Sequence, residues 1–468
     1  MKRITIWALA AGLLAGTALT SCDTSSDTTD TTTNDCAVTA VTLGTLKRTV
    51  ETKSASTGND TTFTVNVSGS LYPMSIDQLN NRIYNADSLP TGTNADRTVF
   101  STFTASGTVA IRSLSDGKDT LFVQTDSTDC RTPRTLRVYS ADGTMQREYT
   151  LEVRVHKEEA DSFVWSRLRA DAASPTASYT ASRLLCSGTT LCLFGTKADG
   201  TSSLSRASVA DGAFGDEATI TSANGEAIDV RSIQLMGGTF WAMAGERLVA
   251  SATGTGVWND VNTGVAIASL IGATADSLYA VTADSRIVAS ADGVNWSAQT
   301  AGTDGTLPAS HMASAAGTSH TDAGITTIVW LGRDAQGNTS VWKHDIDSHA
   351  DHTFPWVNIP QTEELRGYGC PALSQPALVA YDGGVVLLGI TDGAQASPLY
   401  ASADLGRTWK STTYRSPSIA APASIAATVD GTQHIWVVCG GTGEVWRGRI
   451  NRLGWTDDPK TILKTHRR

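Results

Sequence analysis

The segment Tyr400-Ala-Ser-Ala-Asp-Leu-Gly-Arg-Thr-Trp409 decides how the rest of the sequence is interpreted. It follows the pattern Ser-x-Asp-x-Gly-x-Thr-Trp, whose members are Ser402, Asp404, Gly406, Thr408 and Trp409. An aspartate in a turn accepts hydrogen bonds from backbone amides, and a glycine there adopts a positive φ without strain. The tryptophan begins the next strand and packs into the core. The segment therefore predicts a hairpin turn with a structural role.

This pattern resembles the Asp-box, the hairpin signature of sialidase-type β-propeller blades. A shorter version is formed by Ser290, Asp292, Gly293 and Trp296, and a version without the aspartate ends at Trp258. Both belong to a longer repeat, in which an aromatic residue opens a polar strand every 38 to 60 residues. The aromatic residues are Trp165, Phe214, Trp258, Trp296, Trp356, Trp409 and Trp455.

This repeat length is typical of four-stranded propeller blades with loop insertions. The sequence therefore predicts an all-β protein with a propeller over residues 159–456 and a tail over 457–468. We expect six blades, with seven as the alternative. The difference depends on Trp165, which belongs either to an outer strand that closes the ring or to a remnant seventh blade.

The composition agrees with this fold class. The chain has 468 residues, of which 40% are hydrophobic, and this is enough for two or three domains. Its 42 glycines and 12 tryptophans are typical of β-sheets joined by many turns. The formal net charge of −10 disfavours a nucleic-acid partner. The glycine-rich segments lack the context of a phosphate loop, and we expect no cofactor.

The amino-terminal segment has the features of a secretory signal. A basic start precedes an apolar run over 4–19, which is too short for a permanent membrane span. The run leads into Leu19-Thr-Ser-Cys22, which resembles a bacterial lipobox with Cys22 as the lipidated residue. The alternative is an ordinary signal peptide with an incidental cysteine. We expect a signal peptide over 1–21 and a membrane partner through a lipid on Cys22.

Residues 22–35 are nearly all Thr, Ser and Asp after the cysteine, so they can bury little apolar area. They predict a flexible tether, which would hold the folded part beside a membrane. The expected location is the cell envelope, most simply the outer membrane. The leaflet and the exposure to the cell surface stay open.

Seven cysteines occur, and six remain after Cys22 is assigned to the lipid. In an oxidising compartment, Cys36 could pair with Cys130 and Cys186 with Cys192. The alternative for each pair is two buried free thiols. There is no Cys-x-x-Cys motif, which disfavours a zinc or redox site of that type.

Residues 36–158 contain short alternating segments separated by turn signals. The segments are 38–43, 62–67, 120–124, 135–139 and 148–155. Their number and spacing predict an immunoglobulin-like β-sandwich. Between two of them, Ser75-Ile-Asp-Gln-Leu79 predicts the start of a short helix.

Four further segments carry a second resemblance: Leu71–Pro90, Val155–Lys157, Asp161–Trp165 and Val445–Gly454. With them, the chain resembles a family of Bacteroidetes lipoproteins that have an N-terminal immunoglobulin-like domain and a C-terminal propeller. The resemblance covers nearly the whole mature chain. It implies no activity, because none is assigned to that family.

A sialidase resemblance would imply three arginines on a carboxylate, a Tyr–Glu nucleophile pair, an aspartic acid and an Arg-Ile-Pro motif. No Arg-Ile-Pro occurs here, and the propeller arginines lie in no recognisable frame. They are Arg183, Arg231, Arg247, Arg286, Arg333, Arg366 and Arg415. Nothing places the pair of carboxylates that glycoside hydrolysis requires. We assign no catalytic residue, and we favour a protein that is not an enzyme.

The segment 344–352 is rich in histidine and aspartate, and these residues could ligate a divalent metal. They are His344, Asp345, Asp347, His349, Asp351 and His352. The alternative is a polar hairpin between two outer strands. Strand alternation would place His344 and Asp345 on opposite faces.

The loop 363–371 enters an inner strand, where propellers usually build ligand surfaces, so Arg366 and Tyr368 are candidate ligand-binding residues. We interpret the chain as a lipid-anchored envelope protein whose propeller binds a glycan or another envelope protein. A glycan-acting hydrolase with a sialidase-like fold and a structural or assembly factor of the envelope are the alternatives.

Overall fold

The computed structural model describes residues 33–54, 57–170, 174–319, 322–349, 354–361, 365, 367–411 and 416–454. Within these ranges every regular element longer than four residues is a β-strand. The chain divides into two compact units, Met1–Lys157 and Glu158–Arg468, which are described separately. The described residues include no helix of the length and hydrophobicity that a membrane crossing needs.

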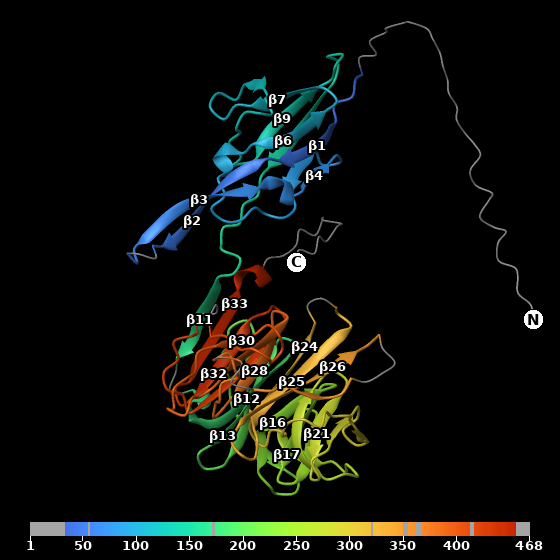
Figure 1. Ribbon diagram of the computed structural model, residues 1–468, viewed down its shortest axis with the longest axis vertical. Helices are drawn as coiled ribbons and strands as arrows, with labels where there is room; N and C mark the ends of the chain where they lie inside the picture. The colour runs from blue at the N-terminus through green and yellow to red at the C-terminus, as the bar shows by residue number, and fades with distance from the viewer. Residues whose placement is uncertain are drawn as a thin grey trace, which may run out of the picture. The chain divides into compact units, whose positions relative to one another are not determined.

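The first unit contains three sheets (Figure 1). Strands β1 (Val38–Leu43) and β6 (Phe100–Ala105) form one antiparallel pair, and the hairpin of β2 (Thr45–Lys53) and β3 (Asp60–Ser68) forms another. The third sheet has the order β4-β5-β10-β9-β7-β8, in which β5 and β10 are parallel. Its strands are β4 (Met74–Asp77), β5 (Arg82–Asn85), β7 (Thr108–Arg112), β8 (Asp119–Leu121), β9 (Arg134–Tyr139) and β10 (Gln146–Glu152).

One hydrophobic cluster joins two of these sheets. Val38 and Phe100, from the β1–β6 pair, belong to the same cluster as Ile83, Leu136 and Leu151 of the six-stranded sheet. The two sheets therefore pack face to face as a sandwich, because each buries one alternating face. The immunoglobulin-like topology stays a prediction.

The predicted helix at Ser75 is wrong. Met74–Asp77 form β4, which pairs with β5. The carboxylate of Asp77 accepts the backbone N–H groups of Leu79 and Asn80 at 3.1 and 3.0 Å. An aspartate that satisfies the two amides after it stabilises a turn in place of a helix.

The second unit is a β-propeller, and the model confirms the predicted all-β fold. Six inner strands of the described chain contact one another in sequence, and the last contacts the first, so they form a closed ring. These strands are β12 (Tyr179–Ser187), β16 (Ile228–Met236), β20 (Ile267–Ala273), β24 (Ser310–Thr318), β28 (Ala377–Tyr381) and β31 (Ser424–Val429). They run from green to red in Figure 1.

Each inner strand begins an antiparallel set of strands that extends outward, and the first two sets join into one eight-stranded sheet through a parallel pair of their outer strands, Ala218–Ser222 and Gly256–Asp260. The first two sets contain β13 (Thr190–Lys197), β14 (Ser202–Ser208), β15 (Ala218–Ser222), β17 (Thr239–Ala244), β18 (Arg247–Ser251) and β19 (Gly256–Asp260). The third and fourth contain β21 (Leu278–Thr282), β22 (Ile287–Ser290), β23 (Ser297–Ala298), β25 (Ile325–Arg333), β26 (Thr339–Asp347) and β27 (Val357–Asn358). The last two contain β29 (Gly384–Leu388), β30 (Tyr400–Ser402), β32 (Ile435–Gly440), β33 (Glu444–Ile450) and β11 (Phe163–Ala170).

Strand β11 comes first in the sequence of this unit, but it pairs with β33 at the outer edge of the last sheet. Trp165 lies on β11, so it belongs to the outer strand of this sheet. Side chains add to the closure, since the hydroxyl of Ser182 in β12 donates to that of Ser424 in β31 at 2.9 Å. The ring is thus joined by residues from both ends of the unit.

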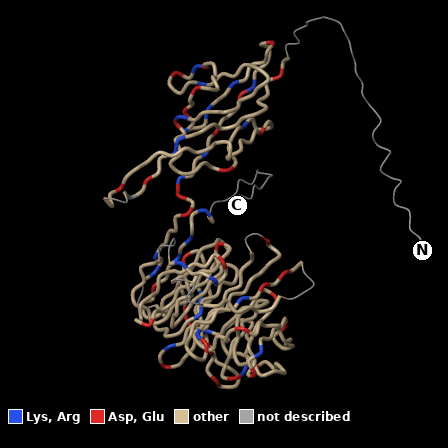
Figure 2. Tube along the Cα trace, in the orientation of Figure 1, with Lys and Arg blue, Asp and Glu red and all other residues tan. Residues whose placement is uncertain are grey.

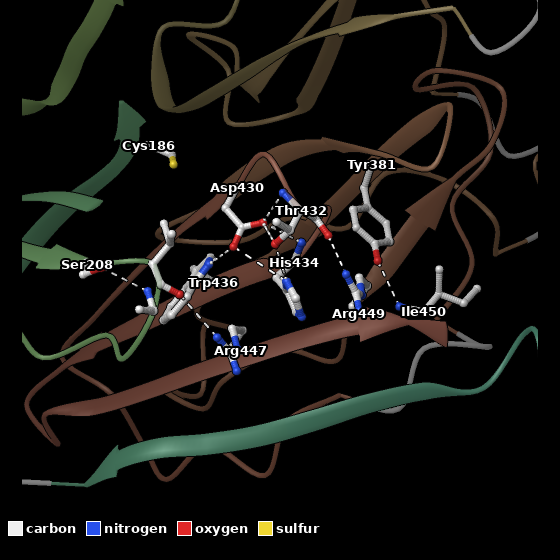
Figure 3. A network of polar contacts seen from close by, with 12 residues as sticks. Cys186, Ser208, Tyr381, Asp430, Thr432, His434, Trp436, Arg447, Arg449 and Ile450 are labelled. Atoms are coloured by element: carbon white, nitrogen blue, oxygen red, sulfur yellow. Dashed lines mark hydrogen bonds and ion pairs between the residues drawn. The ribbon is translucent and has the colours of Figure 1, made fainter. Parts of the chain in front are cut away.

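A polar network supports the β31–β32 turn of this last sheet (Figure 3). The buried carboxylate of Asp430 accepts Trp436 Nε1–H at 2.8 Å and the backbone N–H of Thr432 at 2.8 Å. The guanidinium of Arg447 lies over the Trp436 ring and donates at 3.3 Å to the carbonyl of Val209, in the turn directly after β14 of the first sheet. Burial acts to raise the pKa of Asp430, but these hydrogen bonds outweigh it and lower the pKa. The network therefore joins the last sheet to the first.

The 402–409 turn follows β30. Asp404 accepts the backbone N–H of Thr408 at 2.8 Å and its hydroxyl at 2.6 Å, while Ser402 donates to the same carboxylate at 2.8 Å. Gly406 has a φ of 103°. Trp409 is buried against Val329 and Val341 of the preceding sheet. Burial acts to raise the pKa of Asp404, but the bonds from Thr408 and Ser402 keep it below its usual value.

The 290–296 turn repeats this arrangement. Asp292 accepts the backbone N–H groups of Val294 and Asn295, both at 2.8 Å, and its pKa is lowered chiefly by the bonds from Asn295. The indole N–H of Trp296 donates to the carbonyl of Gly293 at 3.0 Å. A Cβ atom on Gly293 would lie 2.2 Å from the ring of Trp241 in the preceding sheet. In both turns the glycine and tryptophan connect neighbouring sheets.

Candidate functional site

The inner strands surround a cavity of about 660 Å³ at the ends where these strands begin. This volume is typical of small-molecule sites. A second cavity of about 290 Å³ lies further along the same strands. Arg183 of β12 and Gln234 of β16 line both, so the two cavities share a polar wall. We call the larger space the central cavity.

Arg231 spans the central cavity. It lies on β16, and its guanidinium donates to Gln375 Oε1 at 3.3 Å and to the carbonyl of Pro376 at 3.0 Å, just before β28. In the ring order β28 is the third inner strand from β16 in either direction. Gln375 in turn donates to the carbonyls of Thr180 and Ala423 at 3.3 and 2.9 Å. These contacts hold the Arg231 guanidinium in a fixed position.

Arg183 is less well satisfied. Its Nη2 donates to Gln234 Oε1 at a long 3.4 Å, and its Nε is buried without a hydrogen-bond partner in the described part of the chain. Burial, followed by repulsion from Arg231, lowers the pKa of Arg183 to about 10. Burial also lowers the pKa of Arg231. Arg183 remains a cation at neutral pH, because its pKa is well above 7.

The described lining of the central cavity contains one carboxylate, that of Asp229, which is exposed. The Asp229 side chain accepts the backbone N–H of Arg231 at 3.0 Å. The ion pairs of the described residues include neither Arg183 nor Arg231. Elsewhere along the propeller, basic and acidic residues are interspersed (Figure 2). The cavity is therefore a local concentration of positive charge in an acidic chain.

The candidate ligand-binding residues predicted from the sequence are not part of the described lining of the central cavity. Arg366 lies outside the described residues. Tyr368 is half exposed and stacks under the ammonium of Lys410, beside the 402–409 turn and not on the central cavity. Sequence reasoning missed Arg183 and Arg231 as a pair. Their positions in the sequence could have indicated the pair, because each arginine falls among the first five residues of an inner strand.

The predicted metal site does not form among the described residues, which contain no group of three or more metal-ligating side chains. His344 is buried and stacks on Trp356 with ring centroids 5.0 Å apart. On the opposite face of β26, Asp345 pairs with Lys343 at 3.0 Å. Asp347 accepts the backbone N–H of His349. Strand alternation separates the first two residues, and Asp351 and His352 lie outside the described residues.

The predicted disulfides are also absent from the described structure, where all six cysteines are free. Cys186 is opposite Leu191 and Cys192 is opposite Leu185, so the two thiols point to opposite faces of the sheet. Cys36 and Cys130 are both buried in the core of the first unit. Burial raises the pKa of Cys130 to about 11 and keeps its thiol protonated. The lipidation candidate, Cys22, lies outside the described residues.

Comparison with protein families identifies the chain. A model described as the DUF6242 beta propeller domain matches residues 159–458. The chain belongs to the DUF6242 family. A second model, for the DUF6242 N-terminal domain, matches residues 41–153. The comparison with curated proteins gave no match.

Solved propeller structures are similar at low identity. The protein AofleA from Arthrobotrys oligospora is 14% identical, with a TM-score of 0.37 over 59% of this chain and 84% of its own. The sialidase of Trypanosoma rangeli is 12% identical, with a TM-score of 0.36 over 62% and 59%. The six-bladed fungal lectin of Aleuria aurantia is 15% identical, with a TM-score of 0.31 over 57% and 89%. Similarity at this level carries no argument about function.

Proposed function

We propose that this DUF6242 protein is a lipid-anchored envelope protein whose propeller binds a glycan, without catalysis, in the central cavity. The main observation behind this proposal is the central cavity. Its volume of about 660 Å³ suits a small saccharide, and its walls supply fixed polar groups from several sheets. A protein partner would need a broad contact surface, whereas a concave site of this size suits a small ligand.

The polar groups of the cavity are suited to recognition. Sugar hydroxyls donate to and accept from amides, and Gln234 and Gln375 place amide groups on opposite parts of the lining. Ser269, Ser310 and Ser314 add hydroxyls from β20 and β24. Hydrolysis of a glycoside would require two carboxylates at a defined separation. The described lining of the cavity supplies one carboxylate, that of Asp229. The geometry therefore favours binding over cleavage.

Filling the cavity is expected to abolish binding. Ala268 of β20 is exposed and lines the central cavity, so Ala268→Trp would occupy the space of a sugar ring. Ala298 of β23 is exposed at the outer edge of the same sheet, and Ala298→Trp is the matched control. The test is a glycan-array screen of the full chain, purified in detergent. Loss of signal in the first variant alone supports the site, whereas equal signals from both variants contradict it.

The lipid anchor is part of the proposal and is supported by the sequence Leu19-Thr-Ser-Cys22 and the tether after it. The anchor would hold the propeller at the surface of an envelope membrane, where glycans are abundant. Mass spectrometry of the N-terminal peptide tests it. A peptide that begins with an acylated Cys22 is expected, and an unmodified Cys22 in the mature protein would contradict it.

A further inference from the structure

We infer that the central cavity binds an oxyanion, a carboxylate or sulfate group carried by the glycan, between Arg183 and Arg231. This inference rests on the proposed function and names the chemical class of its ligand. The observation behind it is an imbalance of charge and hydrogen bonding within the cavity. Two guanidinium groups line one space, and the described residues give neither of them an ion-pair partner.

The hydrogen-bond inventory of the two arginines points to the same ligand. A guanidinium has five N–H donors, and those donors that are buried normally have hydrogen-bond partners. Arg183 has one long bond to Gln234, and its buried Nε has none. Two oxygens of one carboxylate or sulfate group can accept two parallel bonds from one guanidinium, which is the strongest arrangement for such a pair. An oxyanion beside Arg183 would satisfy the donors that the protein leaves free.

The arrangement is costly without a ligand. Two like charges repel each other in a partly desolvated space, and the pKa of Arg183 is lowered first by burial and then by this repulsion. Arg231 is kept in place by Gln375 and Pro376, so it cannot move away from Arg183 without losing two hydrogen bonds. Two fixed cations that share a cavity with one exposed carboxylate, that of Asp229, are typical of a binding site that trades stability for function.

The inference predicts a preference between two closely matched sugars. We expect trigalacturonate to bind at least about 30-fold more tightly than its fully methyl-esterified form, because the ester lacks the charge that pairs with Arg183. Binding should weaken as salt is raised, since the attraction is screened. A sulfated trisaccharide of the same length distinguishes sulfate from carboxylate as the preferred group.

The experiment is calorimetric titration of the full chain in detergent with these three trisaccharides. Arg183→Gln is expected to bind acidic and esterified sugars equally weakly, and Arg183→Lys to keep only part of the preference. Arg286→Gln, which removes an exposed propeller arginine paired with Asp284, is the control. Without ligand, Arg183→Gln should melt at the same temperature as the wild type or higher. A lower melting temperature would assign Arg183 a structural role.

The outcomes separate the inference from the proposed function. Equal wild-type binding of acidic and esterified trisaccharides would overturn the oxyanion site and leave glycan binding in the cavity standing. Acidic binding that survives Arg183→Gln would also overturn the site. If no oligosaccharide on the array or in the calorimeter binds to the wild type, both the inference and the proposed function are wrong.

Discussion

Replacement of Trp409 by alanine is expected to lower the free energy of unfolding of the propeller by about 3–5 kcal/mol. Trp409 has 2% of its surface exposed and packs among residues of two neighbouring sheets. Its indole N–H also donates to the carbonyl of Gly406 at 3.1 Å. The substitution therefore leaves a large cavity between sheets and removes the hydrogen bond that closes the 402–409 turn.

Chemical denaturation followed by circular dichroism measures this loss. Tyr368→Ala is the control, because Tyr368 lies beside Trp409 but is half exposed and contacts it through a backbone carbonyl, which the substitution keeps. We expect the control to cost less than about 1 kcal/mol. Similar losses in the two variants would mean that Trp409 does not join the sheets as described.

The turn around Trp409 also shows what the sequence can establish. Ser402, Asp404, Gly406 and Thr408 interact within eight residues of chain, so their spacing alone predicts their hydrogen bonds. The same holds for the 290–296 turn. Local chemistry of this kind recurs in these two turns, and the recurrence is visible without knowledge of distant contacts.

The second large effect is expected from Gly293→Ala, at about 3 kcal/mol. Gly293 has a φ of 74°, which costs an alanine about 1–2 kcal/mol. Its Cβ would also lie 2.2 Å from the Trp241 ring, and such overpacking costs a further 1–3 kcal/mol, roughly. The ring is buried in the preceding sheet, so it has little room to move.

Gly225→Ala is the matched control for this prediction. Gly225 has a φ of 80°, but nothing lies within 4 Å of a Cβ placed on it. The control therefore isolates the backbone cost, and the difference between the variants measures the contact between sheets. Equal melting temperatures for the two variants would contradict tight packing of the 290–296 turn on Trp241.

The central cavity was beyond prediction from the sequence. Arg231 and Gln375 are far apart in the chain and meet only because the ring places β16 opposite β28. A pattern of neighbouring residues cannot show this contact. The choice of Arg366 and Tyr368 relied on loop position alone, and Tyr368 lies away from the cavity.

The histidine-rich segment shows a different limit, since its described part, His344 to His349, does not gather into a metal site. Six histidine and aspartate residues in nine positions predicted a cluster, but a strand sends successive side chains to opposite faces. His344 points into the core, where burial lowers its pKa and keeps it neutral beside Trp356. The number of histidines and aspartates in a segment does not show whether their side chains lie on the same face of a strand, as a metal site requires.

The most direct test of the central claim is a crystal structure of the full chain with trigalacturonate bound. Our account predicts electron density for the sugar in the central cavity, with a carboxylate within hydrogen-bonding distance of the Arg183 guanidinium. Density on the outer sheets or beside Tyr368, with the central cavity empty of sugar, would contradict it.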